Sequence, residues 1–582
     1  MKHLYILFIL YLLFVPFVIR AQNLEEIGLK KGAKLSGSVN LNAVGYAAKG
    51  IEARRDPFNW FLSGNLNVNL FGYNAPLSFS YSNAGGNFTQ PFNQFSFAPQ
   101  YKWVKTYIGY SSMTFSPYTL AGYTFLGGGV EVTPDKWKIA AMYGRLKKAV
   151  SYNLQDSTQY TEASYKRMGY GFKVGYDNNG NTVTVSLFQA KDDISSLPFV
   201  LPESQITPQQ NIAVSLGGHV KVTSALFIEG EYGLSALNTD IRKNKESIDT
   251  IAIANHNLIQ GLLPQNSTQR YYDAFNGSVG YQGSWYKLQV KYERIAPEYT
   301  TLGAYYFNND MRNITIVPAV QLFQNKLTLS ANVGLQQNNL DKTRNATTKR
   351  VVGALNATYA PNENWNFAGN YSNFSSYSNM RPQLDPYYKN TLDTLNYYQV
   401  TQTSSGTATY SFGDKNQRQS IMLMGSYQRA NTHAGYAEGN DLSDFYTGNV
   451  AYSYSLAPKS LTLATAFNYY LSNASTVNSL YWGPTLSVTK GLLAKTLRSS
   501  LASSFNKTTA NGASSGPVWN NRLSLSYSPK KAGGEKQAGR HNAMLGINRM
   551  QKFAGTDTGT SNTTASKKYT EWTINSSYTY SF

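Results

Sequence analysis

The stretch Tyr569–Phe582, YTEWTINSSYTYSF, alternates between two kinds of side chain. Because successive side chains of a β-strand point to opposite faces, every second residue shares a face. One face is apolar and aromatic and consists of Trp572, Ile574, Ser576, Tyr578, Tyr580 and Phe582. The other is polar and consists of Glu571, Thr573, Asn575, Ser577, Thr579 and Ser581. The pattern predicts either the last strand of a membrane barrel or the edge strand of a soluble sheet.

The composition favours the membrane barrel. Charged residues make up 14% of the 582 residues, against about 25% in an ordinary soluble domain. The chain has 45 Tyr and 28 Phe and is rich in Asn, Ser, Thr and Gly, which suits a sheet with lipid on one face and water on the other. The mean hydropathy of −0.37 and the lack of a long apolar run after Ala21 argue against a bundle of transmembrane helices.

The first 21 residues read as a secretory signal peptide. Lys2 and His3 precede an apolar run from Leu4 to Ile19, and cleavage after Ala21 would leave Gln22 as the first residue. A membrane anchor is the alternative, but the run is short for one. The chain has no Cys, which excludes disulfides, thiolate metal sites and a lipid-modified cysteine. We therefore expect a signal peptide over residues 1–21, a short periplasmic tail over 22–34 and a barrel over 35–582.

Strand-like segments follow one another from Leu35 to the end of the chain. Phe58–Leu70 is the clearest of them, and at roughly 3.3 Å per residue a strand of this length crosses a bilayer core of about 30 Å even when tilted. The connections alternate in length. Short turns lie at 177–180, 223–224, 282–284, 324–326, 361–363 and 458–459, and long segments lie at Lys191–Gln210, Ala236–Arg270, Ala296–Arg312, Asn373–Tyr397 and Ala430–Ser443.

Regular alternation of short and long connections is typical of an all-β, transmembrane, antiparallel up-and-down β-barrel with short periplasmic turns and long external loops. Counting the strand-like segments from Leu35 to Phe582 gives about 26 strands, within a range of 24–28. An even count places both termini in the periplasm. The pattern is least clear between Gln90 and Val132. There, Gln94–Ala98 and Trp103–Tyr110 are one strand or two, and Phe115–Gly122 is a strand or a loop.

A barrel of this width is too wide for its own side chains to fill, so water, inward loops or a partner must occupy the lumen. Alternation in the strand Tyr286–Tyr292 directs Lys287 and Lys291 to the lumen, and the same rule directs His219 there. The apolar segment Ile248–Leu263 has three interpretations: a constriction inside the lumen, a cap on the barrel, or a surface helix on a neighbouring loop.

The formal net charge of +20 indicates an anionic partner. Lipopolysaccharide around the barrel, anionic solutes in the lumen and acidic polymers are the candidates, whereas nucleic acid does not fit a secreted chain. We expect no cofactor, no metal site and no catalytic residue. Glu229 and Glu231 lie on the strand next to His219, but a barrel hydrolase would need its catalytic groups near the external rim. Because His219 lies close to a periplasmic turn, we interpret it as a lumen-facing histidine without a catalytic role.

The signal-peptide end at Ala21-Gln22, the Tyr- and Asn-rich strands and the final Phe582 resemble outer-membrane β-barrel proteins of Bacteroidota, which are Gram-negative bacteria. The segments Pro117–Gly122 and Tyr143–Lys148 look like features of a group among them, although that likeness implies no particular activity. The C-terminal strand is similar to the signal that the barrel-assembly machinery reads, and in this chain the matching residues are Trp572, Tyr578, Tyr580 and Phe582.

The resemblance implies an outer-membrane location and a non-enzymatic role. The sequence lacks the plug domain of a TonB-dependent transporter and the periplasmic jelly-roll of a lipopolysaccharide-insertion barrel, so two functions stay open. One is a porin-like channel for hydrophilic, including anionic, solutes. The other is a barrel subunit or scaffold of an envelope machine for secretion, polysaccharide handling or motility, with a periplasmic or surface protein as its partner.

Overall fold

A computed structural model describes most of the chain. The described residues are 34–70, 73–83, 93–151, 163–197, 206–243, 262–264, 266–305, 309–343, 347, 349–373, 376–379, 397–432, 442–473, 478–514, 516–529, 540–555 and 568–582. Among them, no helix has both the length and the apolar character needed to cross a membrane.

The described residues form one continuous sheet of strand segments. In chain order the segments are β1 (Lys34–Lys49), β2 (Phe58–Leu70), β3 (Tyr73–Ser82), β4 (Gln94–Phe97), β5 (Gln100–Tyr101), β6 (Val104–Thr114), β7 (Ala121–Val132), β8 (Trp137–Lys147), β9 (Lys166–Asn178), β10 (Asn181–Asp193), β11 (Gln210–Lys221), β12 (Leu226–Asn238), β13 (Gln269–Gln282), β14 (Tyr286–Ile295), β15 (Met311–Leu322), β16 (Leu327–Gln337), β17 (Lys349–Tyr359), β18 (Trp365–Ser372), β19 (Ser376–Asn379), β20 (Tyr397–Gly413), β21 (Gln417–Thr432), β22 (Leu442–Leu456), β23 (Leu461–Asn473), β24 (Asn478–Leu492), β25 (Leu497–Ala510), β26 (Ala513–Ser514), β27 (Val518–Tyr527), β28 (Arg540–Lys552) and β29 (Tyr569–Ser581). Two single 3-10 turns, Ile194–Ser196 and Leu493–Lys495, follow β10 and β24.

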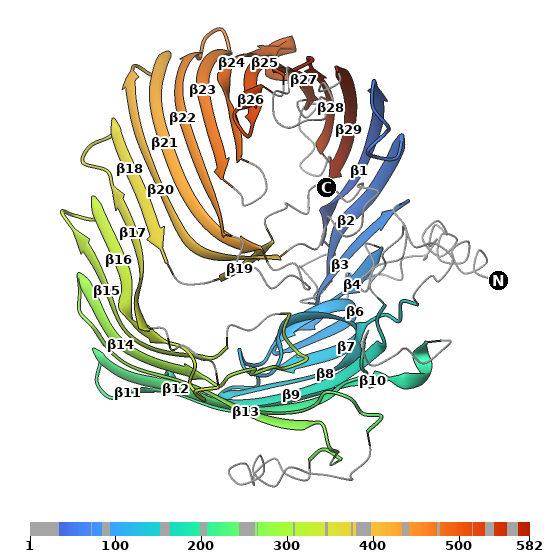
Figure 1. The fold of residues 1–582 in the computed structure, drawn as a ribbon, viewed down its shortest axis with the longest axis vertical. Helices are drawn as coiled ribbons and strands as arrows, with labels where there is room; N and C mark the ends of the chain where they lie inside the picture. Colours follow the sequence, from blue (N-terminus) through green and yellow to red (C-terminus); the bar gives the residue numbers. More distant parts are fainter. Residues whose placement is uncertain are drawn as a thin grey trace, which may run out of the picture.

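The sheet closes on itself because β1 pairs with β29 along twelve residue pairs from Ser38↔Ser581 to Lys49↔Thr570. Phe582 adds two further bonds, since its N–H donates to the Gly37 carbonyl at 3.1 Å and its carbonyl accepts from the Gly37 N–H at 3.0 Å. Figure 1 shows the last, dark red strand beside the first, dark blue one. The predicted C-terminal strand is therefore the closing strand of a barrel.

The barrel has 26 strands, all of them antiparallel to their neighbours, as the alternation predicted. The 29 strand segments exceed this number because three strands are broken. The first break divides β4 from β5, which both pair with β3 and β6. In the same way β18 and β19 both pair with β20, and β26 and β27 both pair with β25.

The two open questions near Gln90–Val132 have clear answers. The broken strand β4–β5 and the next strand β6 are separate, so Gln94–Ala98 and Trp103–Tyr110 belong to two strands. Residues 115–120 connect β6 to β7 and are not a strand. Other predicted regions lie wholly or mostly outside the described residues: the signal peptide and the tail over 1–33, the apolar segment Ile248–Leu263, and the connections Asn373–Tyr397 and Ala430–Ser443.

The predicted hairpins are confirmed, and their short turns lie at one end of the barrel. The turn between β9 and β10 is typical: the Asp177 carboxylate accepts from the Gly180 N–H at 3.0 Å, which fixes the tight reversal. The long connections lie at the other end and include those after β10, β12, β14, β19 and β21. We call these the short-turn end and the long-connection end.

The strands carry apolar side chains on the outer face and mostly polar ones on the inner face, which is the arrangement of a transmembrane barrel. On β10, for example, Val183 and Val185 are about half exposed, whereas Ser186 and Phe188 are buried against other parts of the chain. The outer face carries a girdle of large apolar residues that continues from strand to strand. A closed sheet of this kind leaves no strand edge unpaired, which is what lipid requires.

Candidate functional site

Two connections at the long-connection end fold back against the inner face of the barrel. The first inner segment is residues 115–120, between β6 and β7, and the second is residues 296–305, between β14 and β15. With inner-face residues of β6–β14 they form the largest buried apolar cluster of the described residues: Met113, Phe115, Tyr118, Leu120, Tyr123, Phe125, Ala140, Met142, Leu146, Phe188, Ala190, Leu237, Tyr272, Ala274, Ile295, Tyr299 and Leu302. Ala296–Arg312 was predicted as an external loop, and its first ten residues instead pack inside.

The two inner segments are joined by hydrogen bonds to main-chain carbonyls. The Tyr299 hydroxyl donates to the Tyr118 carbonyl at 2.7 Å, and the Thr301 hydroxyl donates to the Thr119 carbonyl at 2.8 Å. The Ala121 N–H, where β7 begins, donates to the Gly303 carbonyl at 2.9 Å. The segments are separated by about 180 residues in the chain, so their contact fixes the interior of this part of the barrel.

The barrel wall supplies side chains that hold the same segments. Asn211, fully buried on β11, accepts from the Leu302 N–H at 3.1 Å. The Ser235 hydroxyl donates to the Thr300 carbonyl at 2.6 Å. Ser116 is hydrogen-bonded to Glu231 of β12. These bonds satisfy polar groups that would otherwise be buried without partners.

Two glycines make room for the close approach. A Cβ at Gly233 on β12 would lie 2.5 Å from the Tyr118 Cβ, and a Cβ at Gly303 would lie 2.5 Å from the Thr119 carbonyl oxygen. Both distances are shorter than van der Waals contact. The wall and the second segment are therefore shaped to receive the first one.

The phenols at the centre of this contact stay uncharged. Burial raises the pKa of Tyr118, which also accepts a hydrogen bond from the Asn276 amide at 2.8 Å. Burial also raises the pKa of Tyr299, whose side chain is completely buried. Both hydroxyls therefore serve as neutral hydrogen-bonding groups at any physiological pH.

The structure brings two of the three predicted lumen residues together. The His219 ring stacks on Phe227 with centroids 5.4 Å apart, and the Lys287 Nζ lies 5.1 Å from the centroid of the same ring. Lys291 pairs with Ser278 and Thr315 in the sheet register. Whether these residues line a path for solutes stays a prediction.

Glu229 organises the polar groups around His219. Its carboxylate lies 3.3 Å from the His219 Nδ1 and accepts from the Ser278 hydroxyl at 2.9 Å and from the Gln289 amide at 2.8 Å. Ser278 therefore bonds to the carboxylate and not to the imidazole, so the group lacks the serine–histidine contact of a nucleophilic triad. The described geometry suits a fixed polar wall rather than a reaction centre.

The inner face of β20–β25 differs from this wall because its side chains are mostly small, polar and uncharged. Ser420 and Ser453 share a hydrogen bond at 2.8 Å across β21 and β22. Asn449 donates to Asn468 at 2.8 Å, and Asn468 donates to Thr485 at 2.9 Å, which links β22, β23 and β24. Such side chains can donate and accept hydrogen bonds toward water or a hydrophilic solute.

Ion pairs fix the long-connection end of the wall that holds the inner segments. Arg167 of β9 donates to both carboxylate oxygens of Asp192, at 2.7 and 2.9 Å, and both side chains are buried. The Gln209 side chain and main chain bind the same pair. Because removing one partner of a buried pair typically costs about 3–5 kcal/mol, this pair is a firm link between β9, β10 and the residues before β11.

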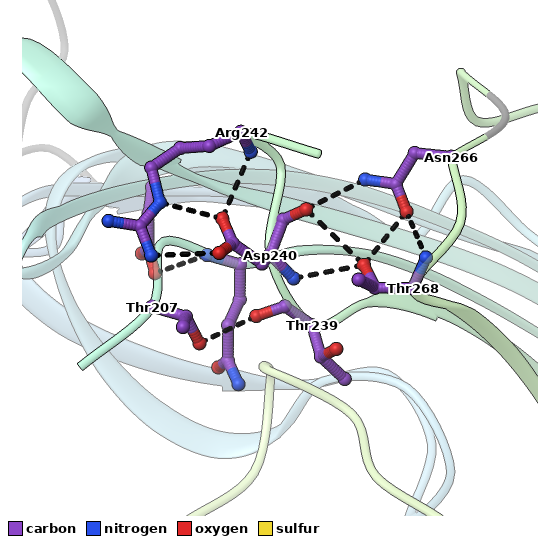
Figure 2. A network of polar contacts seen from close by, with 8 residues as sticks. Thr207, Thr239, Asp240, Arg242, Asn266 and Thr268 are labelled. Atoms are coloured by element: carbon purple, nitrogen blue, oxygen red, sulfur yellow. Dashed lines mark hydrogen bonds and ion pairs between the residues drawn. The ribbon is translucent and has the colours of Figure 1, made fainter. Parts of the chain in front are cut away.

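A second network closes the base of the connection between β12 and β13, and Figure 2 shows its members around Asp240. The Arg242 guanidinium donates to both Asp240 carboxylate oxygens at 2.8 Å. Asn266 and Thr268 donate to the Asp240 carbonyl at 2.8 and 3.2 Å. The hydrogen bonds from Arg242 hold the pKa of the Asp240 carboxyl below its usual value. Nearby Leu263, the described end of the apolar segment Ile248–Leu263, is buried against β11 and β12.

The residues of the predicted assembly signal lie on the closing strand and just beyond it. Trp572 and Tyr578 are exposed on the outer face. The Arg549 guanidinium lies 5.3 Å from the Trp572 ring centroid, and the Tyr578 hydroxyl lies 2.6 Å from the His541 Nδ1. The Tyr580 and Phe582 rings are 5.5 Å apart. Recognition of these residues by the assembly machinery stays a prediction.

Comparison with known proteins adds little to this picture. No family model matches the chain, and no curated protein matches it. Among solved structures, the outer membrane protein opdK from Pseudomonas aeruginosa is similar at 10% identity and a TM-score of 0.28, over 65% of this chain and 94% of that chain.

Two other solved structures align over more of the chain. The ferric citrate transporter FecA in the unliganded form matches at 9% identity and a TM-score of 0.36, over 94% of this chain and 78% of that one. The ferric enterobactin receptor PfeA in complex with BCV-L6 matches at 10% identity and a TM-score of 0.40, over 95% and 82%. At such values the fold assignment rests on the strand pairing of the chain itself.

Proposed function

We propose that the chain is an integral outer-membrane protein that forms a porin-like channel for hydrophilic solutes. The observation that carries the proposal is the polar, largely uncharged inner face of β20–β25, across the barrel from the wall that holds the inner segments. A barrel of 26 strands is wider than its own side chains can fill. Inner segments seated on one wall leave room for water beside the other.

The location follows from the outer face and the N-terminus. The apolar outer girdle and the closed sheet suit a bilayer, and the predicted signal peptide directs the chain across the inner membrane, with cleavage near Ala21. In this proposal the short-turn end faces the periplasm and the long-connection end faces outward. Outer-membrane lipid and lipopolysaccharide surround the barrel, and the barrel-assembly machinery inserts it.

The proposed preference for anions rests on charge. The chain carries a formal net charge of +20. Lys287 and Lys291 lie on the same strand face as Gln289, whose amide donates a hydrogen bond to the Glu229 carboxylate. Fixed positive charges in a watery path favour anions over cations. Glu229, Glu231 and Glu293 on the same wall offset part of this charge, so we expect a modest preference.

Reconstitution of the purified chain into a planar bilayer under a salt gradient tests both parts of the proposal. We expect discrete conductance steps and a reversal potential whose sign shows that anions pass more readily than cations. Replacing Lys287 and Lys291 together by Gln should shift that potential toward the cation side while the conductance steps remain. A reversal potential on the cation side in the unaltered protein contradicts the charge argument but keeps the channel.

A silent bilayer would instead support the second function, a non-catalytic barrel subunit or scaffold of an envelope machine. The observation that favours this alternative is the docking of both inner segments by buried contacts, since more of the long connections could fill the lumen in the same way. In that case the partner would be a periplasmic or surface protein.

A further inference from the structure

Three positive side chains and one glutamine form a row across four neighbouring strands at the long-connection end of the barrel. The register places Arg294 of β14 opposite Arg312 of β15, Arg312 opposite Gln337 of β16, and Gln337 opposite Lys349 of β17. Neighbouring strands lie about 4.8 Å apart, so the row spans roughly 14 Å. We call these four residues the cation row.

The cation row lies on the outer face. The residues two positions away on the last three strands are Ile314, Leu335 and Val351, whose side chains are 51%, 63% and 62% exposed. Because side chains alternate along a strand, Arg312, Gln337 and Lys349 share the face of these aliphatic residues. The row therefore borders an apolar surface on its short-turn side and the long connections on its other side.

The charges of the cation row are only partly compensated. Arg294 donates to the Asp273 carboxylate at 2.5 Å, which neutralises one cation. Arg312 donates to the neutral Gln337 amide oxygen at 2.5 Å, and Lys349 is exposed. Like charges directly opposite each other destabilise an antiparallel pair, and Asp273 offsets only one of the two charges of the Arg294–Arg312 pair.

Another ion pair at the same end of the outer face shows the contrast. Arg429 of β21 lies opposite Asp444 of β22 and donates to both of its carboxylate oxygens at 2.8 and 3.2 Å. There, one cation meets one anion across the strands. The cation row instead keeps an excess of two positive charges beside an aliphatic surface.

We propose that the cation row binds the phosphorylated headgroup of a lipopolysaccharide-type lipid, whose acyl chains lie on Ile314, Leu335 and Val351. Guanidinium groups bind phosphate oxygens in a planar, two-pronged geometry, and a lysine adds a point charge. The width of the row suits a headgroup that carries more than one phosphate. The inference rests on the proposed outer-membrane location, with the long-connection end toward the leaflet that holds this lipid.

The test compares lipid binding by the purified full chain and by the variant Arg312→Gln/Lys349→Gln. Arg294 is left in place because its removal would expose Asp273. Native mass spectrometry in detergent follows titration with lipid A that carries its phosphates and with the same lipid after enzymatic dephosphorylation. We expect the unaltered chain to prefer the phosphorylated lipid and the double variant to bind it about tenfold more weakly, which corresponds to the loss of about 1.4 kcal/mol.

A matched control removes one positive charge from the opposite end of the same face. Lys490 of β24 donates to the Lys459 carbonyl at 2.7 Å beside the short turn between β22 and β23. Lys490→Gln should leave the preference for phosphorylated lipid unchanged. If the double variant does not assemble, Lys349→Gln alone provides the measurement, with an expected weakening of about threefold, because one charge-assisted contact is lost rather than two.

Equal binding of phosphorylated and dephosphorylated lipid by the unaltered chain would overturn the inference, as would equal loss in the Lys490→Gln control. Bilayer recording separates this result from the proposed channel. The double variant should conduct like the unaltered chain because the cation row lies outside the lumen. A silent bilayer together with phosphate-dependent lipid binding would refute the channel and keep the lipid site.

Discussion

Replacing Tyr299 by Ala should release the two inner segments from the barrel wall. The Tyr299 side chain is fully buried, and its hydroxyl donates to the Tyr118 carbonyl at 2.7 Å. Removing a buried aromatic side chain typically costs about 3–5 kcal/mol, and the lost hydrogen bond adds about 1 kcal/mol. If docking is weakened by about 4 kcal/mol, the undocked population rises about a thousandfold, since 1.4 kcal/mol corresponds to a factor of ten.

Hydrogen exchange measures this change at amides that are protected only by docking. The Leu302 N–H donates to Asn211, and the Ala121 N–H donates to the Gly303 carbonyl. Both amides should exchange far faster in the Tyr299→Ala variant, while amides in the strand ladders of β20–β25 should keep their rates. Tyr299→Phe loses only the hydroxyl and should accelerate exchange about fivefold.

The control for this experiment is Tyr143→Ala, which removes a tyrosine that is 62% exposed on the outer face of β8. Its exchange at Leu302 and Ala121 should match that of the unaltered chain. Protection within about threefold of the unaltered chain in a folded Tyr299→Ala variant would refute the reasoning, because a loss of 4 kcal/mol cannot leave docking intact. A larger single-channel conductance in the same variant would show that the inner segments narrow the path.

Three further predictions concern assembly, topology and pH. Deleting Phe582, or replacing Tyr580 and Phe582 by Ser, should abolish the heat-modifiable barrel in the outer membrane, because the closing contacts with Gly37 are lost or weakened. Protease added to intact cells should cut within Ala236–Arg270 and Asn373–Tyr397 and should spare Gln22–Lys34 and Lys530–Arg540; cleavage within the last range would reverse the topology. Asp240 has a lowered carboxyl pKa in the folded state, so its contribution is complete above the usual carboxyl pKa and is lost as the pH falls through the lowered value. Cleavage by pepsin near residue 240 should therefore rise toward pH 2 in the unaltered chain, whereas Asp240→Asn should already be sensitive at pH 4.

The barrel itself could be predicted from the sequence because its signal repeats in every strand. Lipid requires apolar side chains on one face, so alternation in stretches such as Tyr569–Phe582 and Phe58–Leu70 is strong and local. The short turns carry their own local chemistry, as Asp177 and Gly180 show. The broken strand β4–β5 was harder to predict because four-residue and two-residue segments are too short for a period to be distinguished.

The inner segments could not be predicted because nothing local distinguishes an inner residue that meets water from one that meets another segment. Ser186 and Ser235 are buried under the inner segments, whereas Ser405 and Ser453, on inner faces across the barrel, are half-buried. All four are serines in strands whose polar and apolar residues alternate. The available signal was the apolar character of the connections themselves, since Tyr118, Leu120, Tyr299 and Leu302 are unusual in a loop that faces water.

The kind of contact that holds the inner segments bears on how the protein can be regulated. Tyr299, Thr301 and Ser235 all bind main-chain carbonyls, and their hydroxyls are neutral. Salt screens interactions between exposed charges far more than buried neutral hydrogen bonds, so docking should not respond to ionic strength. Exposed charges such as Lys287, by contrast, are screened. A change of ion selectivity with salt concentration would therefore report on the wall charges alone. If the conductance steps changed with salt by more than the conductivity of the bulk solution does, the inner segments would have to move.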